Sequence, residues 1–184
     1  VHITEGDIQV NQTCSDLFGL IEERGALEAA ATTDTEAEEN DTDADLDGPL
    51  FDPDNRDQQK IERAIRKKIN KPHEELTKAD LEEVEELLLF EKGITDISSL
   101  VALKELEELY LPKNQISDLT PLAELPELEE LHAPDNQITD LTPLAGLGKL
   151  EKIDLTRNQV SDLTPLAELA ELEELTLSDN QITD

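Results

Sequence analysis

The sequence contains few aromatic residues, a single cysteine and no long apolar run. Its four aromatic side chains are those of Phe18, Phe51, Phe90 and Tyr110. Because Cys14 is the only cysteine, the chain has neither an internal disulfide nor a zinc site built on several thiolates. No apolar run approaches the ~18 residues that a membrane-spanning helix needs, so no membrane span is predicted.

Basic residues are also scarce. The 184 residues include 15 Lys and Arg against 46 Asp and Glu, which gives a formal net charge of -31. Such a chain repels the phosphates of nucleic acids and of anionic lipids, so neither is expected as a partner. A protein with a basic surface, or a cation, fits this charge better.

Acidic residues dominate the first 50 residues, which hold 14 acids and one base. Residues 1–31 form a segment of unassigned role, in which Ser15 is placed to cap one short helix. Residues 32–49 contain eight acids, no base and no aromatic residue. This composition predicts a solvated, disordered linker.

Residues 50–83 are expected to form a small helical unit. Isoleucine recurs at every fourth position within residues 57–70, which predicts one amphipathic helix that ends before Pro72. After it, Thr77 and Asp80 stand three residues apart, which is the pattern of a capping box at the start of a second short helix.

From residue 84 onward the sequence repeats every 22 residues. Asparagine recurs with this spacing, at Asn114, Asn136, Asn158 and Asn180. The repeated unit, L-x-x-L-x-L-x-x-N-x-I, is that of a leucine-rich repeat, and residues 84–184 hold about five copies. Because the sequence contains no methionine and stops within a repeat, we expect a fragment of a longer protein whose array continues.

The period predicts an α/β fold, namely a leucine-rich repeat solenoid of horseshoe shape. Alternation along each strand turns two apolar side chains inward, such as Leu109 and Leu111, and the strands stack into a parallel concave sheet. Asn114 is expected to bond the backbone of neighbouring turns. On the convex side, Thr120 before Pro121 is expected to cap a short helical turn. The preceding helical unit then covers the N-terminal end of the array as a cap.

The repeat N-Q-I-T-D-L-T-P-L-A resembles the 22-residue class found in bacterial internalins and related surface proteins. The segment Leu50–Asp54 and the two helical segments after it are similar to the helical cap of that family. The resemblance covers roughly residues 50–184. It implies a curved solenoid that binds a protein on its concave face, usually at the cell surface, and it implies no catalytic activity.

Two aromatic residues fall on outward positions of adjacent predicted strands. Aromatic anchors among polar neighbours are typical binding hot spots, so we predict a contact patch of Leu88, Phe90, Tyr110 and His132. Charged residues nearby complete the predicted partner-binding set, namely Glu108, Glu130, Asp154 and Arg157. In the alternative interpretation, Leu88 and Phe90 pack under the cap or against a neighbouring chain.

Glutamates also follow the repeat and form two neighbouring columns. The columns are Glu85, Glu107, Glu129, Glu151 and Glu173, and Glu86, Glu108, Glu130, Lys152 and Glu174. Adjacent strands lie about 4.8 Å apart, and like charges at that spacing repel by about 1 kcal/mol per pair in water. The columns therefore favour salt, divalent cations or a basic partner, unless they are simply a solvated face produced by duplication of the repeat.

The acidic linker carries a possible cation site. Asp43, Asp45 and Asp47, followed by Asp54, match most of the calcium-loop pattern D-x-D-x-D-G with an acid at the last position. A proline after the glycine and an aspartate in place of the final glutamate depart from this pattern. Calcium is accordingly the one cation considered, and no other cofactor is predicted.

The chain contains no phosphate-binding glycine loop, nucleophile elbow or metal-binding helix motif. We therefore predict a monomeric, non-enzymatic protein-recognition module, secreted or displayed on the surface of a bacterium, whose partner has a basic surface. Two alternatives stay open. One is a cytoplasmic scaffold or phosphatase-regulator-like subunit, and the other is the targeting arm of an enzyme whose catalytic domain lies outside this sequence.

Overall fold

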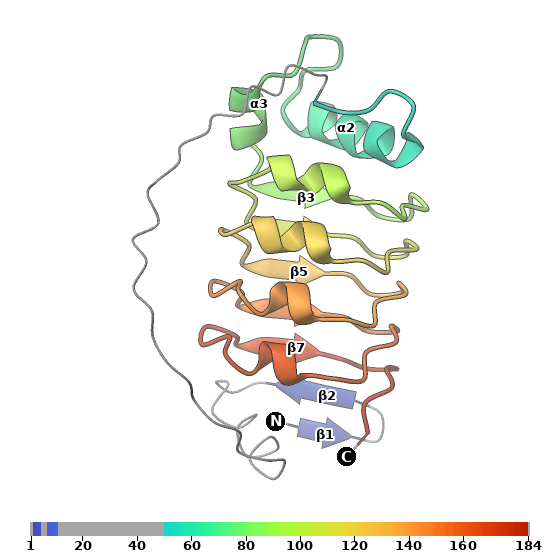
Figure 1. Ribbon diagram of the computed structural model, residues 1–184, viewed down its shortest axis with the longest axis vertical. Helices are drawn as coiled ribbons and strands as arrows, with labels where there is room; N and C mark the ends of the chain where they lie inside the picture. Colours follow the sequence, from blue (N-terminus) through green and yellow to red (C-terminus); the bar gives the residue numbers. More distant parts are fainter. Residues whose placement is uncertain (1, 5–6, 11–49, 184) are drawn as a thin grey trace, which may run out of the picture.

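The computed structural model describes residues 2–4, 7–10 and 50–183. Within these residues a helical cap, a stack of repeats and a hairpin are arranged along one long axis (Figure 1). All strands join in one seven-stranded sheet of order β1-β2-β7-β6-β5-β4-β3. The predicted leucine-rich repeat solenoid, with a parallel sheet and short helical turns, is confirmed.

The longer helix of the cap is α2 (Arg56–Lys68). It begins where the Asn55 side chain accepts hydrogen bonds from the first backbone N–H groups of the helix, and its isoleucines Ile61 and Ile65 are buried. The helix ends two residues before the predicted limit, because Asn70 adopts a left-handed φ of 57°. The buried isoleucine stripe joins the cap to the core of the repeats.

The shorter helix is α3 (Lys78–Glu82), and it has the predicted capping box. The Thr77 hydroxyl accepts a hydrogen bond from the N–H of Asp80, whose carboxylate accepts one from the N–H of Thr77 at 2.9 Å. Lys71 forms an ion pair with the same buried carboxylate. The hydrogen bonds from Lys71 and Thr77 lower the pKa of Asp80 to about 2, so the cap holds this residue ionised.

Each repeat contributes one short parallel strand. These strands are β3 (Glu86–Leu88), β4 (Glu108–Tyr110), β5 (Glu130–His132), β6 (Lys152–Asp154) and β7 (Glu174–Thr176). In the register, Glu86 lies opposite Glu108, and Tyr110 lies opposite His132. Positions that recur every 22 residues in the sequence are therefore lateral neighbours in the sheet.

The core is a continuous aliphatic layer behind this sheet, with the predicted inward side chains buried. Asparagine closes each turn. The Asn136 Nδ2 donates to the carbonyl oxygens of Leu111 at 2.9 Å and Ala133 at 3.1 Å, while its Oδ1 accepts from the N–H of Ile116 at 3.0 Å. Asn114 and Asn158 make the equivalent bonds, so the predicted bridging of neighbouring turns is confirmed.

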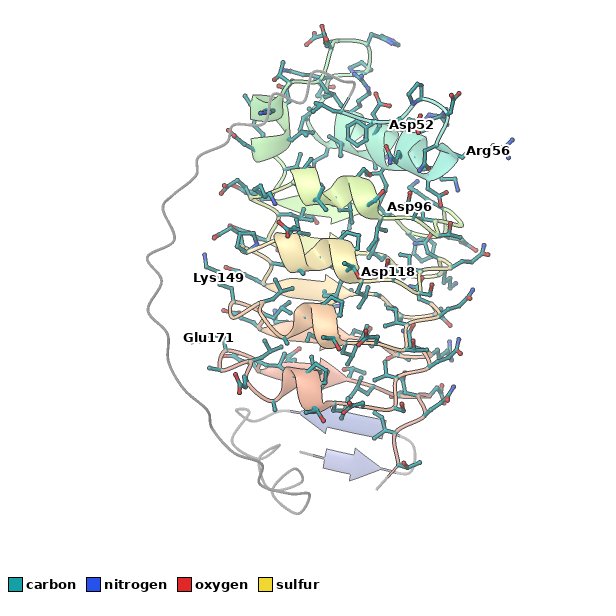
Figure 2. All side chains as sticks on the ribbon, viewed as in Figure 1. Asp52, Arg56, Asp96, Asp118, Lys149 and Glu171 are labelled. Atoms are coloured by element: carbon teal, nitrogen blue, oxygen red, sulfur yellow. The ribbon has the colours of Figure 1, made fainter. Side chains whose placement is uncertain are left out.

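The convex side carries one 3₁₀ turn per repeat. These turns are η2 (Ser98–Ala102), η3 (Thr120–Glu124), η4 (Thr142–Leu144) and η5 (Thr164–Leu166). The predicted capping role of Thr120 is wrong, because Thr120 is the first helical residue. The Asp118 carboxylate accepts a hydrogen bond from the N–H of Thr120 at 2.8 Å, and the bonds from Thr120 lower the pKa of Asp118. Asp96 holds the same position one repeat earlier, and the two residues lie one above the other in Figure 2.

One buried carboxylate ties the cap to the first repeat. Asp57 Oδ2 accepts hydrogen bonds from the Thr95 N–H at 2.7 Å, the Thr95 hydroxyl at 2.8 Å and the Asp96 N–H at 3.1 Å. Its Oδ1 pairs with Lys60 at 2.7 Å. Burial opposes ionisation, but these bonds prevail and hold the pKa of Asp57 well below its ordinary value. The connection joins α2 to the loop before η2.

A hairpin occupies the end of the sheet remote from the cap (Figure 1). It consists of β1 (His2–Thr4) and β2 (Asp7–Val10), and β2 pairs antiparallel with β7. The sequence analysis missed this hairpin, although the alternation of apolar and polar residues in β2 is the ordinary signal for a strand. The helix predicted after Ser15 and the linker of residues 32–49 lie outside the described residues.

Candidate protein-binding surface

Two large apolar side chains stand exposed at the cap end of the concave sheet. Leu88 ends β3 and is 57% exposed, and Phe90 follows it and is 52% exposed. Neither is covered by the cap, so packing under the cap is wrong, whereas packing against a neighbouring chain stays a prediction. Among the described residues, the other exposed large hydrophobic is Val101, at 38%, which lies in η2 on the convex side.

The next two strands add a stacked pair of rings. The rings of Tyr110 and His132 lie 4.7 Å apart between centroids and are inclined by only 6°. The Tyr110 hydroxyl contacts Glu108 Oε2 at 2.9 Å and Glu130 Oε2 at 3.3 Å. Burial, together with these two carboxylates, raises the pKa of Tyr110, so the phenol stays neutral and fixed in place.

Glu130 is the most highly connected acid of this surface. Lys152 forms an ion pair with it from β6, and His132 Nε2 lies 3.4 Å from its Oε2. The hydrogen bond from Lys152, with those from His132 and Tyr110, outweighs desolvation and lowers the pKa of Glu130. Because Lys152 replaces a glutamate in this column, the charge repulsion expected there is locally relieved.

The structure brings most of the predicted binding residues together on β3, β4 and β5. Asp154 on β6 lies opposite His132, but its carboxylate is engaged by the N–H and hydroxyl of Thr156, at 2.9 and 2.7 Å. Arg157 lies farther away, in the turn after β6, where it contacts Asp135 at 3.5 Å and Asp179 at 3.4 Å. Arg157 therefore belongs to the rim of the sheet.

Sequence reasoning missed one neighbour of the patch. The Lys113 ammonium lies 5.4 Å from the centroid of the Phe90 ring, which is within the range of a cation–π contact. Lys113 stands in the turn after β4, one repeat after Glu91, and both adopt left-handed φ, at 55° and 51°. Its position next to Pro112, which is equivalent to Phe90, was the available signal.

Glutamates of the first column also lie next to one another in adjacent repeats. The N–H of Glu107 bonds the carbonyl of Glu85 at 2.8 Å, and the N–H of Glu129 bonds the carbonyl of Glu107 at 2.8 Å. Desolvation and the charges of Glu129, Glu85, Glu127 and Glu108 raise the pKa of Glu107. The column therefore carries an unfavourable electrostatic energy at neutral pH.

No three His, Cys, Asp or Glu side chains gather as a metal site within the described part of the chain. Asp43, Asp45 and Asp47 lie outside it, and Asp54 is exposed in the loop before α2. Calcium binding by the linker thus stays a prediction. None of the described helices is long and apolar enough to cross a membrane.

The repeats of this chain are similar to leucine-rich repeats of known proteins. A family model for Leucine Rich repeats (2 copies) matches residues 126–168. The solved functional domain of InlJ from Listeria monocytogenes is 25% identical, with a TM-score of 0.53, over 59% of this chain and 23% of that chain. The chain therefore has leucine-rich repeats that are similar to those of a bacterial internalin.

Two other solved structures have similar repeats. Internalin C2 from Listeria monocytogenes is 27% identical over 74% of this chain and 89% of that chain, with a TM-score of 0.48. A leucine-rich repeat protein of Leptospira interrogans is 30% identical over 47% of this chain and 23% of that chain, with a TM-score of 0.45. No curated protein gives a significant match.

The chain spans about a quarter of the InlJ and Leptospira chains. The InlJ domain includes a cysteine ladder. In contrast, the only cysteine here is Cys14, which precedes the repeats. The buried columns of these repeats are aliphatic and asparagine side chains.

Proposed function

We propose that this protein is a non-enzymatic recognition module that binds another protein through the concave face of its repeats. The observation that carries the proposal is the exposure of Leu88 and Phe90 beside the stacked rings of Tyr110 and His132. Exposed apolar residues grouped on one surface are typical of interfaces. The rings are held by hydrogen bonds before any partner arrives, which reduces the entropy lost on binding.

The carboxylates near the apolar patch indicate which charge the partner's surface should carry. Glu108 and the other glutamates of its column lie along one side of the apolar centre, so a partner with basic residues facing that side matches this face. The internalin-like repeats support a secreted or bacterial surface protein of which this chain forms a part. A binding role accounts for the patch without a reaction.

The test compares alanine variants on the two faces of one repeat array. Immobilised wild-type protein is used to isolate a binding protein, and its affinity is then measured for Tyr110→Ala, Phe90→Ala and the convex control Val101→Ala. Truncation of a central aromatic anchor typically costs about 2 kcal/mol, or roughly a 30-fold loss of affinity. We expect this loss for Tyr110→Ala and Phe90→Ala only. If both bind as tightly as wild type, the concave patch is not the interface.

A further inference from the structure

A groove of about 700 Å³ lies between the cap and the first repeat. One wall is a single face of α2, formed by Lys60, Arg63, Ala64, Lys67 and Lys68. The other wall is formed by Glu86, Leu87 and Leu88 of β3 and by Lys92 after it. Five cations and one carboxylate therefore line this space.

This local charge is opposite to that of the rest of the molecule. The chain has a net charge of -31, yet seven of its 15 basic residues fall between Arg56 and Lys71. The single groove carboxylate, Glu86, is already paired with Lys68. Lys60 is also satisfied, by Asp57 and by the carbonyl of Gly93 at 3.1 Å.

Three cations of the groove have no counter-ion in the part of the chain that the structure describes. The side chains of Arg63, Lys67 and Lys92 are exposed and form no hydrogen bond or ion pair with residues 50–183. Arg63 and Lys67 are one helical turn apart, where like charges repel each other. Lys92 occupies the position at which the later repeats have the bridging asparagine. The first repeat therefore has a positive charge at this position in place of an amide.

We propose that this groove binds an extended acidic segment of a partner protein. The Cβ atoms of Arg63 and Lys67 are about 5–6 Å apart on the helix. Carboxylates at alternate positions of an extended peptide lie about 6.6 Å apart. A segment with acids at alternate positions therefore reaches both cations, and an apolar side chain of the segment can contact exposed Leu88.

The surroundings of the groove select a slender ligand. The glutamate columns begin at Glu85 and Glu86 and continue across the sheet, so a flat bilayer or a nucleic acid duplex would contact carboxylates as well as the cations. A single extended peptide stays between α2 and β3 and avoids this repulsion. The site is separate from the proposed concave interface, although the two share Leu88 as a border.

The test uses the full chain and a fluorescent synthetic peptide in which aspartate alternates with alanine and leucine. We expect binding at low ionic strength that weakens as salt screens the charges, and no binding of the matched asparagine peptide. Lys67→Glu and Arg63→Glu each weaken binding by about tenfold or more. Lys67→Gln, which introduces no new charge, gives a smaller loss in the same direction.

The matched control is Arg56→Glu. This residue lies on the same helix, outside the groove lining, and points away from the repeats (Figure 2). We expect its affinity for the peptide to stay within about twofold of wild type. Equal weakening by Arg56→Glu and Lys67→Glu would show a general charge effect and overturn the proposal. Tyr110→Ala is expected to leave peptide binding intact, which separates this site from the concave interface.

Other occupants give distinct results, and each would overturn the assignment to a partner segment. Strong peptide binding that appears only after Asp41, Asp43, Asp45 and Asp47 are changed to asparagine would identify the chain's own linker as the occupant. Displacement by inorganic phosphate at the peptide's own concentration would indicate a site for small anions. Lys67-dependent binding to phosphatidylserine vesicles without peptide binding would indicate a membrane surface.

Discussion

The carboxylate of Asp57 provides the sharpest test of how the cap is held on the repeats. Asp57→Ala removes the acceptor for the N–H groups of Thr95 and Asp96 and for the Thr95 hydroxyl, and it leaves Lys60 without its counter-ion. Hydrogen bonds to a charged group contribute about 1.5–3 kcal/mol each, and breaking a buried ion pair costs about 3–5 kcal/mol. Because these contributions overlap, we expect a loss of about 3 kcal/mol in the free energy of unfolding.

The effect also has a defined pH dependence. The folded-state pKa of Asp57 lies below its ordinary value, so the ionised carboxylate stabilises the fold above the unfolded-state pKa of about 4. That stabilisation is lost as the pH falls through the folded-state pKa. The difference between wild type and Asp57→Ala should therefore be full at pH 7 and should shrink under strongly acidic conditions.

Urea denaturation followed by circular dichroism measures both quantities. The control is Asp54→Ala, which removes an exposed acid from the loop before the same helix and should change stability by less than about 0.5 kcal/mol. Amide exchange at Thr95 and Asp96 should accelerate only in Asp57→Ala. An Asp57→Ala protein as stable as Asp54→Ala at pH 7 would refute the idea that this carboxylate holds the cap.

Two further stability effects follow from the repeats. Ser99 is buried and its hydroxyl has no partner among the described residues, whereas the equivalent position of the next repeat is Pro121. Ser99→Pro should therefore raise the free energy of unfolding by about 1 kcal/mol in urea titrations, and destabilisation would contradict this reasoning. Glu107→Gln should raise the melting temperature at low salt more than the exposed control Glu105→Gln, because desolvation and the neighbouring carboxylates both raise the pKa of Glu107 and so disfavour its charge in the folded state. This gain in melting temperature should fade at high salt and as the pH falls through the pKa of Glu107. A wild-type melting temperature that does not depend on salt would rule out repulsion in the column.

The repeated part of the fold could be predicted from the sequence because each repeat position has one physical role. The period that aligns Asn114 with Asn136 also aligns their hydrogen bonds, and the alternation that buries Leu109 leaves Tyr110 half-buried on the opposite face. The capping box at Thr77 is equally local, since both partners lie within one helical turn. Such features depend on neighbours that the sequence itself specifies.

Features that depend on contacts between distant segments could not be predicted in this way. Asp57 bonds Thr95 across the junction of cap and repeat, and no spacing in the sequence indicates that pairing. The Thr120 hydroxyl was assigned a capping role from its place before a proline, but the preceding Asp118 is a stronger acceptor and takes that role. The basic groove was missed because Lys67 and Lys92 belong to different elements that meet only in the folded chain.

The hairpin at the end of the sheet has a consequence for the order of folding. Gln9 pairs with Thr176, so residues near the N-terminus meet their partner strand in the last described repeat. On a ribosome the hairpin emerges before the described repeats, whereas β7 emerges only after β3 to β6. The loop that this pairing closes runs from Gln9 to Thr176, and closure entropy makes such a long-range contact a late event. The seven-stranded sheet can thus be completed only after synthesis has passed β7.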